Sequence, residues 1–205
     1  MLTLIHAPHS RSTRIIALLK ELDALDRVEV RPVEIQRQGQ DRPFAGDARN
    51  PHPEGKVPVL LHDGVEIWES PAIIQYLTDL FPERGIGAPI GSRERGRYLS
   101  WLSWYGDVVE PVLLLAAIRV EHPFLSATFR GVAEMEARLG KALENAPYLL
   151  GDRYSAADLL LHTPFVWFSE AMPANSAIRD WVRRCTERPS SKFAAEYDAS
   201  LLAAA

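Results

Sequence analysis

Three hydroxyl side chains lie close together in HAPHSRSTRI, residues 6–15 of the chain: Ser10, Ser12 and Thr13. This stretch connects an expected strand to an expected helix, so its hydroxyls should lie at the positive N-terminal end of that helix. A thiol bound beside a helix N-terminus has a lowered pKa, and a hydroxyl can donate a hydrogen bond to its thiolate. Each of the three residues is also a good helix N-cap, so capping explains them at least as well as catalysis does.

A proline interrupts a run of strand-forming residues in GKVPVL, residues 55–60. Proline has no N–H to give to a sheet, so it belongs on an edge, at a strand start or at a bulge unless a special backbone geometry is held there. If the Val57–Pro58 bond is cis, the N–H and C=O of Val57 face outward and can pair with an extended peptide ligand. Only about 5 to 6% of X-Pro bonds in folded proteins are cis, and a trans proline at a strand start also fits this sequence.

Glu69 and Ser70 form a third candidate site, just ahead of Pro71. Serine at the N-cap and proline at the first helical position predict a helix start. The N–H groups of a helix N-terminus suit a carboxylate, and the Glu69 carboxylate suits an ammonium group, so the pair could hold the amino-acid head of a ligand. Alternatively, Ser70 only caps its helix and Glu69 is a solvent-exposed charge.

The residues around these sites have the pattern of a βαβ unit followed by a hairpin and a helix. Residues 2–5 and 28–31 have strand patterns and flank a helix whose apolar face consists of Ile15, Leu18, Leu19 and Leu22. Residues 36–54 are polar and lack periodicity, which indicates a surface connection. The Asp-Gly dipeptide at 63–64 favours a type I′ turn between two strands within residues 57–68. The predicted order is therefore βαβ, loop, ββα.

A second region begins after Pro82, where the composition changes to the glycine, proline and charged residues of PERGIGAPIGSRERG. No strand pattern follows, and the downstream segments have helical periodicity. The stretch GDRYSAADLLL contains the clearest helix start, because Ser155 and Asp158 have the spacing of a capping box. We read this pair as a folding element and not as part of a site.

Composition and charge exclude several classes of function. The 205 residues have a formal net charge of -4 and no basic stripe, so nucleic acid is not an expected partner. Cys185 is the only cysteine, which excludes a disulfide framework, a CxxC redox pair and a cysteine-based zinc site within one chain, and His62 and His162 lack metal-ligand spacing. No signal peptide is recognisable, and no apolar run approaches the roughly 20 residues that a membrane span needs. We expect a cytoplasmic protein with no metal and no membrane partner.

Four stretches, in this order and at this spacing, resemble the glutathione S-transferase superfamily: APHSRSTRI, NPHPEGKVPVL, DGVEIWESPAIIQYL and LLGDRYSAADLLL. The resemblance covers nearly the whole chain and favours the bacterial, theta-like members that use a serine. It implies an α/β, thioredoxin-like domain in residues 1–82, a linker in residues 83–92 and an all-α C-terminal domain in residues 93–205. It also implies a homodimer, with glutathione as a co-substrate and no metal.

The resemblance assigns six residues to glutathione binding: Gln40, Lys56, Val57, Pro58, Glu69 and Ser70. Pro58 falls on the superfamily's cis-proline, and the backbone of Val57 would pair with the cysteinyl unit of glutathione. Glu69 and Ser70 would bind the γ-glutamyl head. Lys56, and less directly Gln40, would reach the glycyl carboxylate.

The resemblance places the catalytic hydroxyl on Ser10, which stands as far before the Arg-Ile pair as the catalytic serine of theta-like members does. Ser12 is the alternative. The loop lacks the cysteine of the beta and omega classes, which argues against glutaredoxin-like thiol exchange, and His6 and His9 stand where a catalytic tyrosine would be sought. The implied mechanism is that the serine hydroxyl and the helix end stabilise the thiolate of bound glutathione.

Trp104 and Tyr105, in RYLSWLSWYGD, are the candidates for a pocket that binds the second substrate. Aromatic residues at helical spacing are more often core or dimer contacts. The implied function is the transfer of glutathione to a hydrophobic alkyl or aryl electrophile, as in detoxification. The alternatives are a non-catalytic binding protein of the same fold and a glutathione-dependent isomerase, dehalogenase or peroxidase.

Overall fold

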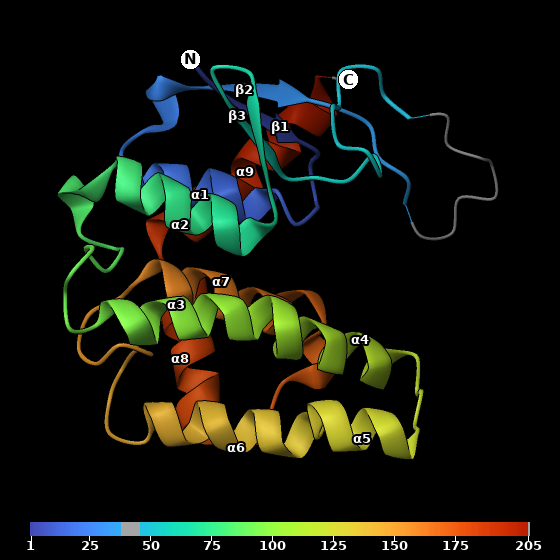
Figure 1. The fold of residues 1–205 in the computed structure, drawn as a ribbon, viewed down its shortest axis with the longest axis vertical. Helices are drawn as coiled ribbons and strands as arrows, with labels where there is room; N and C mark the ends of the chain where they lie inside the picture. Colours follow the sequence, from blue (N-terminus) through green and yellow to red (C-terminus); the bar gives the residue numbers. More distant parts are fainter. Residues whose placement is uncertain (38–45, 205) are drawn as a thin grey trace. The chain divides into compact units, whose positions relative to one another are not determined.

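The computed structural model describes residues 1–37 and 46–204 of the chain (Figure 1). These residues form two compact units. One unit contains the described residues up to Arg84 together with the C-terminal segment from Pro189, and the other contains residues 85–188. The first unit carries the β-sheet and the loop with the candidate serines.

A four-stranded mixed sheet with the order β2-β1-β3-β4 forms the centre of the first unit. Strand β1, Leu2–His6, pairs in parallel with β2, Val28–Pro32, and antiparallel with β3, Val59–His62, which in turn pairs antiparallel with β4, Val65–Trp68. Strand β1 is buried along its whole length, as its run of apolar residues predicts for a central strand. The predicted order of βαβ followed by ββα is confirmed.

Helices α1, Thr13–Leu22, and α2, Ser70–Leu80, lie side by side along the sheet (Figure 1). The predicted apolar face of α1 is confirmed, because its side chains are buried. Helix α2 begins one residue earlier than the sequence predicts, and Glu69 rather than Ser70 occupies its N-cap position. The backbone of Glu69 has a φ of 64°, a region that non-glycine residues rarely adopt, and this residue turns the chain from β4 into the helix.

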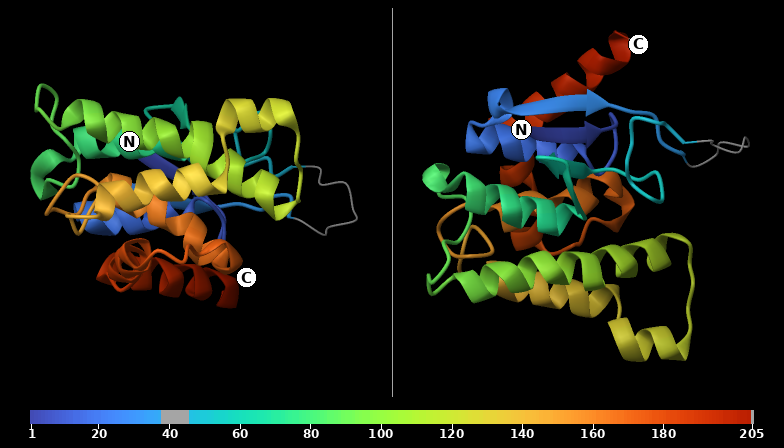
Figure 2. Two further views of the ribbon diagram at one scale, coloured as in Figure 1. Left: turned by 90° about the horizontal axis from the view of Figure 1, so that it is seen from below. Right: turned by 45° about the horizontal axis from the view of Figure 1, so that its top comes forward.

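The last helix, α9 at Pro189–Ala203, belongs to the sheet-containing unit and packs against α1 (Figures 1 and 2). At this contact Ser190 Oγ donates a hydrogen bond to Glu21 Oε1 at 2.5 Å. This differs from the expected boundary, which placed residues 93–205 in one helical domain. Helical periodicity indicates that a helix has a buried face, but it does not indicate which neighbour covers that face.

The second unit is built of helices, as its sequence pattern predicts. Its elements are α3 (Arg95–Trp104), the π-helical turn η3 (Tyr105–Val109), α4 (Glu110–Ala117), α5 (Pro123–Phe129), α6 (Val132–Leu143), α7 (Ala156–Trp167), η4 (Ser169–Ala171) and α8 (Ser176–Thr186). The predicted capping box at the start of α7 is confirmed, because the side chains of Ser155 and Asp158 make both of its hydrogen bonds. Among the described residues, no helix is both long enough and apolar enough to cross a membrane.

Candidate functional site

The loop between β1 and α1 places both candidate serines at the N-terminal end of α1. The N–H of Thr13 donates to Ser10 O at 3.1 Å, and the N–H of Ile15 donates to Ser12 O at 2.9 Å. Ser12 occupies the N-cap position of α1, but its hydroxyl makes no capping hydrogen bond with the helix. Helix capping therefore does not account for the Ser12 side chain, and the positive end of the helix lies directly beside the loop.

The Ser10 hydroxyl lies among three polar groups of the same loop. Its Oγ donates to Ala7 O at 2.7 Å, accepts the N–H of Ser12 at 3.1 Å and lies 2.8 Å from Ser12 Oγ. The Ser10 residue is 7% exposed. Because a hydroxyl has one proton, turning it from Ala7 O to a ligand requires rotation about the Cβ–Oγ bond and leaves the accepted hydrogen bond in place.

The Ser12 hydroxyl has a different environment, because the residue is fully buried. Its Oγ accepts the N–H of Ala7 at 3.0 Å, and it lies 2.7 Å from His6 Nδ1 and 3.1 Å from Ala7 O. These contacts join the end of β1 to the start of α1. Without exposed surface, the Ser12 hydroxyl offers a bound thiol no direct approach.

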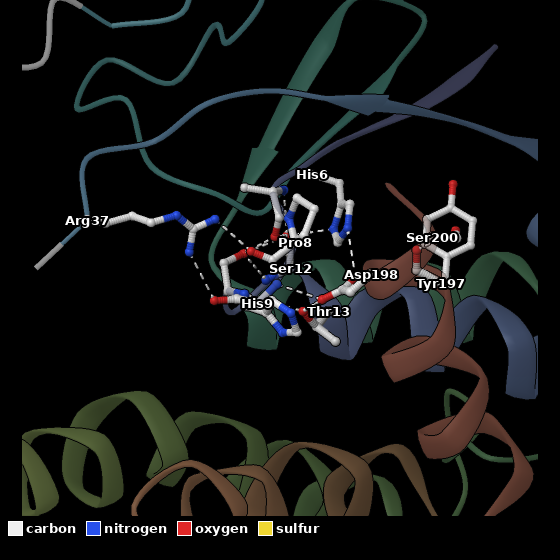
Figure 3. Close-up of polar contacts among 11 residues, drawn as sticks. His6, Pro8, His9, Ser12, Thr13, Arg37, Tyr197, Asp198 and Ser200 are labelled. Carbon is white, nitrogen blue, oxygen red and sulfur yellow. Dashed lines mark hydrogen bonds and ion pairs between the residues drawn. The ribbon is translucent and has the colours of Figure 1, made fainter. Parts of the chain in front are cut away.

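Arg37 reaches back to the loop from the chain that follows β2 (Figure 3). Its guanidinium donates to Pro8 O at 2.7 Å and to His9 O at 3.3 Å. These bonds hold the two peptide units immediately before Ser10. The sequence interpretation missed Arg37, because a basic residue in a polar loop predicts only a solvent-exposed charge.

Asp198 of α9 also contacts the loop, and the sequence interpretation missed it as well. Its Oδ2 accepts the N–H of His9 and the hydroxyl of Thr13, both at 2.6 Å, and its Oδ1 lies 3.1 Å from His6 Nε2 (Figure 3). Burial acts to raise the pKa of Asp198, but the interactions with His6, Thr13 and His9 outweigh it and hold the pKa below its ordinary value. Asp198 is therefore ionised at neutral pH.

Acid should remove the stabilising contribution of Asp198. Because its pKa is lower in the folded chain than in the unfolded chain, the carboxylate stabilises the fold above its ordinary pKa of 3.8, and this contribution is lost as the pH falls through the folded-state value. We expect the difference in unfolding free energy between wild type and Asp198→Asn, measured by urea titration, to shrink from about pH 5 to about pH 2. A difference that stays constant over this range would contradict the lowered pKa.

The Val57–Pro58 segment packs beside the loop with the candidate serines. Its peptide bond is cis. The Val57 side chain is buried in one hydrophobic cluster whose other buried members are Ile5, Ala7, Val33 and Val59. Since the backbone of Ala7 also binds Ser10 and Ser12, the structure brings the Val57 side chain and the candidate serines together around Ala7.

The other candidate glutathione ligands differ in their surroundings. Glu69 is exposed, and its carboxylate makes no hydrogen bond or ion pair with the described residues, whereas Ser70 is buried in the first turn of α2. Lys56 is exposed and pairs with Glu54. Gln40 lies outside the described residues. Within the described part of the chain, no group of three or more His, Cys, Asp or Glu side chains is placed to hold a metal ion.

Trp104 and Tyr105 lie in the helical unit and are 8% and 2% exposed. The ring of Trp104 meets that of Trp101 edge to face, with 5.3 Å between the centroids. The guanidinium of Arg138 lies 4.7 Å from the Trp104 ring centroid. These are the contacts of core residues, which the aromatic pattern also allowed.

Comparisons with known proteins bear on the family and the fold. The family model for the glutathione S-transferase N-terminal domain matches residues 4–85. Glutathione S-transferase GstA of Escherichia coli is 31% identical over 147 residues, which cover 67% of this chain and 71% of GstA. The disulfide-bond oxidoreductase YfcG of Escherichia coli is 28% identical over 213 residues and 93% of each chain. A sphingomonad glutathione S-transferase solved in complex with glutathione superposes with a TM-score of 0.75 at 25% identity, over 96% of this chain and 98% of the other.

Proposed function

Because the chain belongs to the glutathione S-transferase superfamily, we propose that it binds glutathione, lowers the pKa of its thiol and uses the thiolate to attack a hydrophobic electrophile. The observation that carries the proposal is the place of the Ser10 hydroxyl, at the positive end of α1 in the domain that the family model matches. The relatives support it further, since one is named a glutathione S-transferase and another was solved with glutathione.

The energies of these groups are sufficient for the role. A thiol with a pKa near 8.5 is ionised by only a few per cent at neutral pH, and lowering that pKa by ~2 units requires about 2.7 kcal/mol of preferential thiolate stabilisation. A hydrogen bond to a charged group contributes ~1.5 to 3 kcal/mol, and a helix N-terminus contributes ~0.3 to 1 kcal/mol. In the proposed step the Ser10 hydroxyl turns from Ala7 O to the sulfur, while Ser10 Oγ keeps the N–H of Ser12 as its donor.

We assign the donor role to Ser10 and a loop-holding role to Ser12. Ser12 is fully buried and its hydroxyl contacts Ala7 and His6. Ser10 retains some exposure, and its proton can turn to a ligand without breaking the hydrogen bond that its oxygen accepts.

Glutathione binding is proposed to use the residues that the superfamily resemblance implies. The backbone of Val57 pairs with the cysteinyl unit, Glu69 and Ser70 bind the γ-glutamyl head, and Lys56 and Gln40 are the candidates for the glycyl carboxylate. The surroundings of Glu69 support its part, because an exposed carboxylate without a partner among the described residues can take up an ammonium group. The adjacent N-terminus of α2 suits the carboxylate of the same head group.

Glu69→Ala is expected to raise the Kd for glutathione by about 10- to 100-fold, because a hydrogen bond to a charged group contributes ~1.5 to 3 kcal/mol. At saturating glutathione, kcat should stay within about threefold of wild type, since Glu69 binds the ligand far from its sulfur. Isothermal titration calorimetry measures the Kd, and Glu83→Ala, another exposed glutamate of the same unit, is the matched control. A lowered kcat with an unchanged Kd would contradict the assignment.

The second substrate is proposed to be a small hydrophobic electrophile in a detoxification reaction. We further propose a homodimer that works in the cytoplasm, where glutathione keeps thiols reduced.

Thiol–disulfide exchange is the competing function, because one relative is named a disulfide-bond oxidoreductase. The loop of this chain has serines in place of a redox cysteine, and Cys185 is buried in α8 of the other unit. Turnover of chlorodinitrobenzene and of a mixed glutathione disulfide separates the two functions. Thioether formation supports the transferase, disulfide reduction alone supports the competitor, and tight binding of glutathione without either reaction indicates a binding protein.

A further inference from the structure

Among the described residues, the polar contacts of the Asp198 carboxylate lie within residues 6–13, the segment that carries Ser10. Asp198 is fully buried, and its two oxygens face the N–H of His9, the hydroxyl of Thr13 and the imidazole of His6 (Figure 3). Thr13 lies 185 residues earlier in the sequence. The last helix of the chain is therefore tied to the loop on both sides of Ser10.

Close packing of α9 does not by itself require a carboxylate at position 198. Burying a charge is costly unless hydrogen bonds offset it, and a well-packed apolar side chain is often as stabilising as a buried ionic group. The interactions of Asp198 are directional, since two short bonds fix the peptide N–H of His9 and the side chain of Thr13 relative to α9. Because hydrogen bonds depend on direction, these two bonds fix the position of the loop between β1 and α1.

The same carboxylate sets the direction of the hydrogen bonds inside the loop. Ionised Asp198 only accepts, so a neutral His6 carries its proton on Nε2, 3.1 Å from Asp198 Oδ1. Both atoms are buried, and among the described residues neither makes a hydrogen bond of ordinary geometry, the contact between them included. His6 Nδ1 then accepts the proton of Ser12 Oγ at 2.7 Å, so the Ser10 proton can go to Ala7 O, to Ser12 Oγ at 2.8 Å or to a ligand.

Ser12, His6 and Asp198 are the residue types of a hydrolytic triad, but this cluster does not act as one. All three residues are fully buried, and Ser12 Oγ also accepts the N–H of Ala7. No substrate carbonyl can approach a nucleophile enclosed in this way.

We propose that Asp198 is a positioning residue for the thiol site: by binding His9, Thr13 and His6, it fixes the loop so that the Ser10 hydroxyl faces the bound thiol. The inference rests on the proposed function for its catalytic consequence. Its structural part, the tie between α9 and the loop, stands without glutathione.

Two substitutions of Asp198 distinguish the effect of the loop's position from the effect of the carboxylate's negative charge. Asp198→Ala removes both oxygens and releases the N–H of His9. Asp198→Asn can keep its amide oxygen on His9 and Thr13 and turn its NH₂ group to His6 Nε2, which requires the imidazole proton to move to Nδ1. We therefore expect Asp198→Asn to hold the loop with a reversed His6 tautomer.

The first readouts use the protein without glutathione. In Asp198→Ala, amide exchange at His9 should quicken at least about tenfold relative to wild type. In Asp198→Asn, His9 exchange should stay within about threefold of wild type, while nitrogen NMR of the imidazole shows the His6 proton on Nδ1. Glu196→Ala, which removes an exposed carboxylate from the same helix, should change neither signal.

Unchanged His9 exchange in Asp198→Ala overturns the inference. If Asp198→Ala does not fold, the His6 tautomer in Asp198→Asn decides instead: a reversed tautomer supports the inference, and an unchanged one overturns it.

The second readouts use glutathione and its S-methyl derivative, which lacks the thiol proton. Asp198→Ala should lower kcat by about 10- to 100-fold, with the Kd for S-methylglutathione within about twofold, whereas Asp198→Asn should keep kcat within about threefold. An equal loss of kcat in both variants, with His9 exchange near wild type in Asp198→Asn, overturns the positioning role. A wild type that does not ionise bound glutathione overturns the proposed function instead, and the His9 and His6 signals still decide whether Asp198 holds the loop.

Discussion

Ser10→Ala is expected to lower the rate of conjugation at neutral pH by about 25-fold, because bound glutathione should lose the donor that lowers its pKa. If that pKa returns from ~6.5 to ~8.5, the ionised fraction at neutral pH falls from about three quarters to about 3%. The Kd for glutathione at neutral pH should rise only about fourfold, which is the share of binding that ionisation of the thiol contributes, since Glu69, Ser70 and Val57 are unchanged. At about pH 9.5 the variant should approach wild type, because the thiol then ionises without help.

A pH profile of kcat, combined with calorimetry of glutathione binding, checks this result. Ser12→Ala is the matched comparison, since it removes the other loop hydroxyl. It should lower the unfolding temperature more than Ser10→Ala does, because Ser12 Oγ binds Ala7 and His6 in the interior. If Ser12→Ala raises the pKa of the bound thiol and Ser10→Ala leaves it unchanged, the assignment of the donor is wrong.

Asp158→Ala is expected to lower the unfolding temperature by on the order of 10 °C, the largest effect on stability that we predict. Asp158 is fully buried and accepts four hydrogen bonds: from Leu149 N–H at 2.8 Å, Ser155 N–H at 2.9 Å, Ser155 Oγ at 2.6 Å and Trp181 Nε1 at 2.9 Å. Burial raises the pKa of this carboxyl, and the donors act in the opposite direction. Removing the acceptor leaves buried donors unpaired at ~1 to 3 kcal/mol each, and each kcal/mol shifts the unfolding temperature of a chain of this size by roughly 2–4 °C.

Differential scanning calorimetry measures this effect, with Asp152→Ala as the control because Asp152 is exposed in the same connection. Well below its unfolding temperature, the Asp158→Ala variant should bind glutathione with the wild-type Kd, because Asp158 belongs to the helical unit and not to the sheet-containing unit. An unfolding temperature within about 2 °C of wild type would contradict the role of the capping box.

Local patterns predicted most of the secondary structure. The alternation at residues 28–31, the Asp-Gly turn at 63–64 and the apolar face of α1 each depend on residues near one another in the chain, and the structure has all three elements. The start of α7 was predictable for the same reason, because Ser155 and Asp158 are three residues apart. The start of α2 was misplaced by one residue, because the backbone of Glu69 adopts a φ that sequence patterns do not predict for a glutamate.

The candidate site was predictable only in part, because its supports are distant in sequence. Ser10 and Ser12 stood out by their place in the loop. Arg37 and Asp198 did not, since a single charged residue in a loop or on a helix gives no sign of the backbone groups that it will bind. The same limit explains why the sequence placed α9 in the helical domain. It also explains why the aromatic pattern did not distinguish a Trp104 packed against Trp101 in the core from a Trp104 that lines a pocket.

An ultraviolet titration of the thiolate absorption of glutathione, bound to the wild-type protein, tests thiol activation most directly. We predict an apparent pKa ~2 units below the ordinary value of about 8.5, with a thiolate band already present at neutral pH. If bound glutathione ionises at its solution pKa, the protein does not activate the thiol, and the transferase proposal is contradicted.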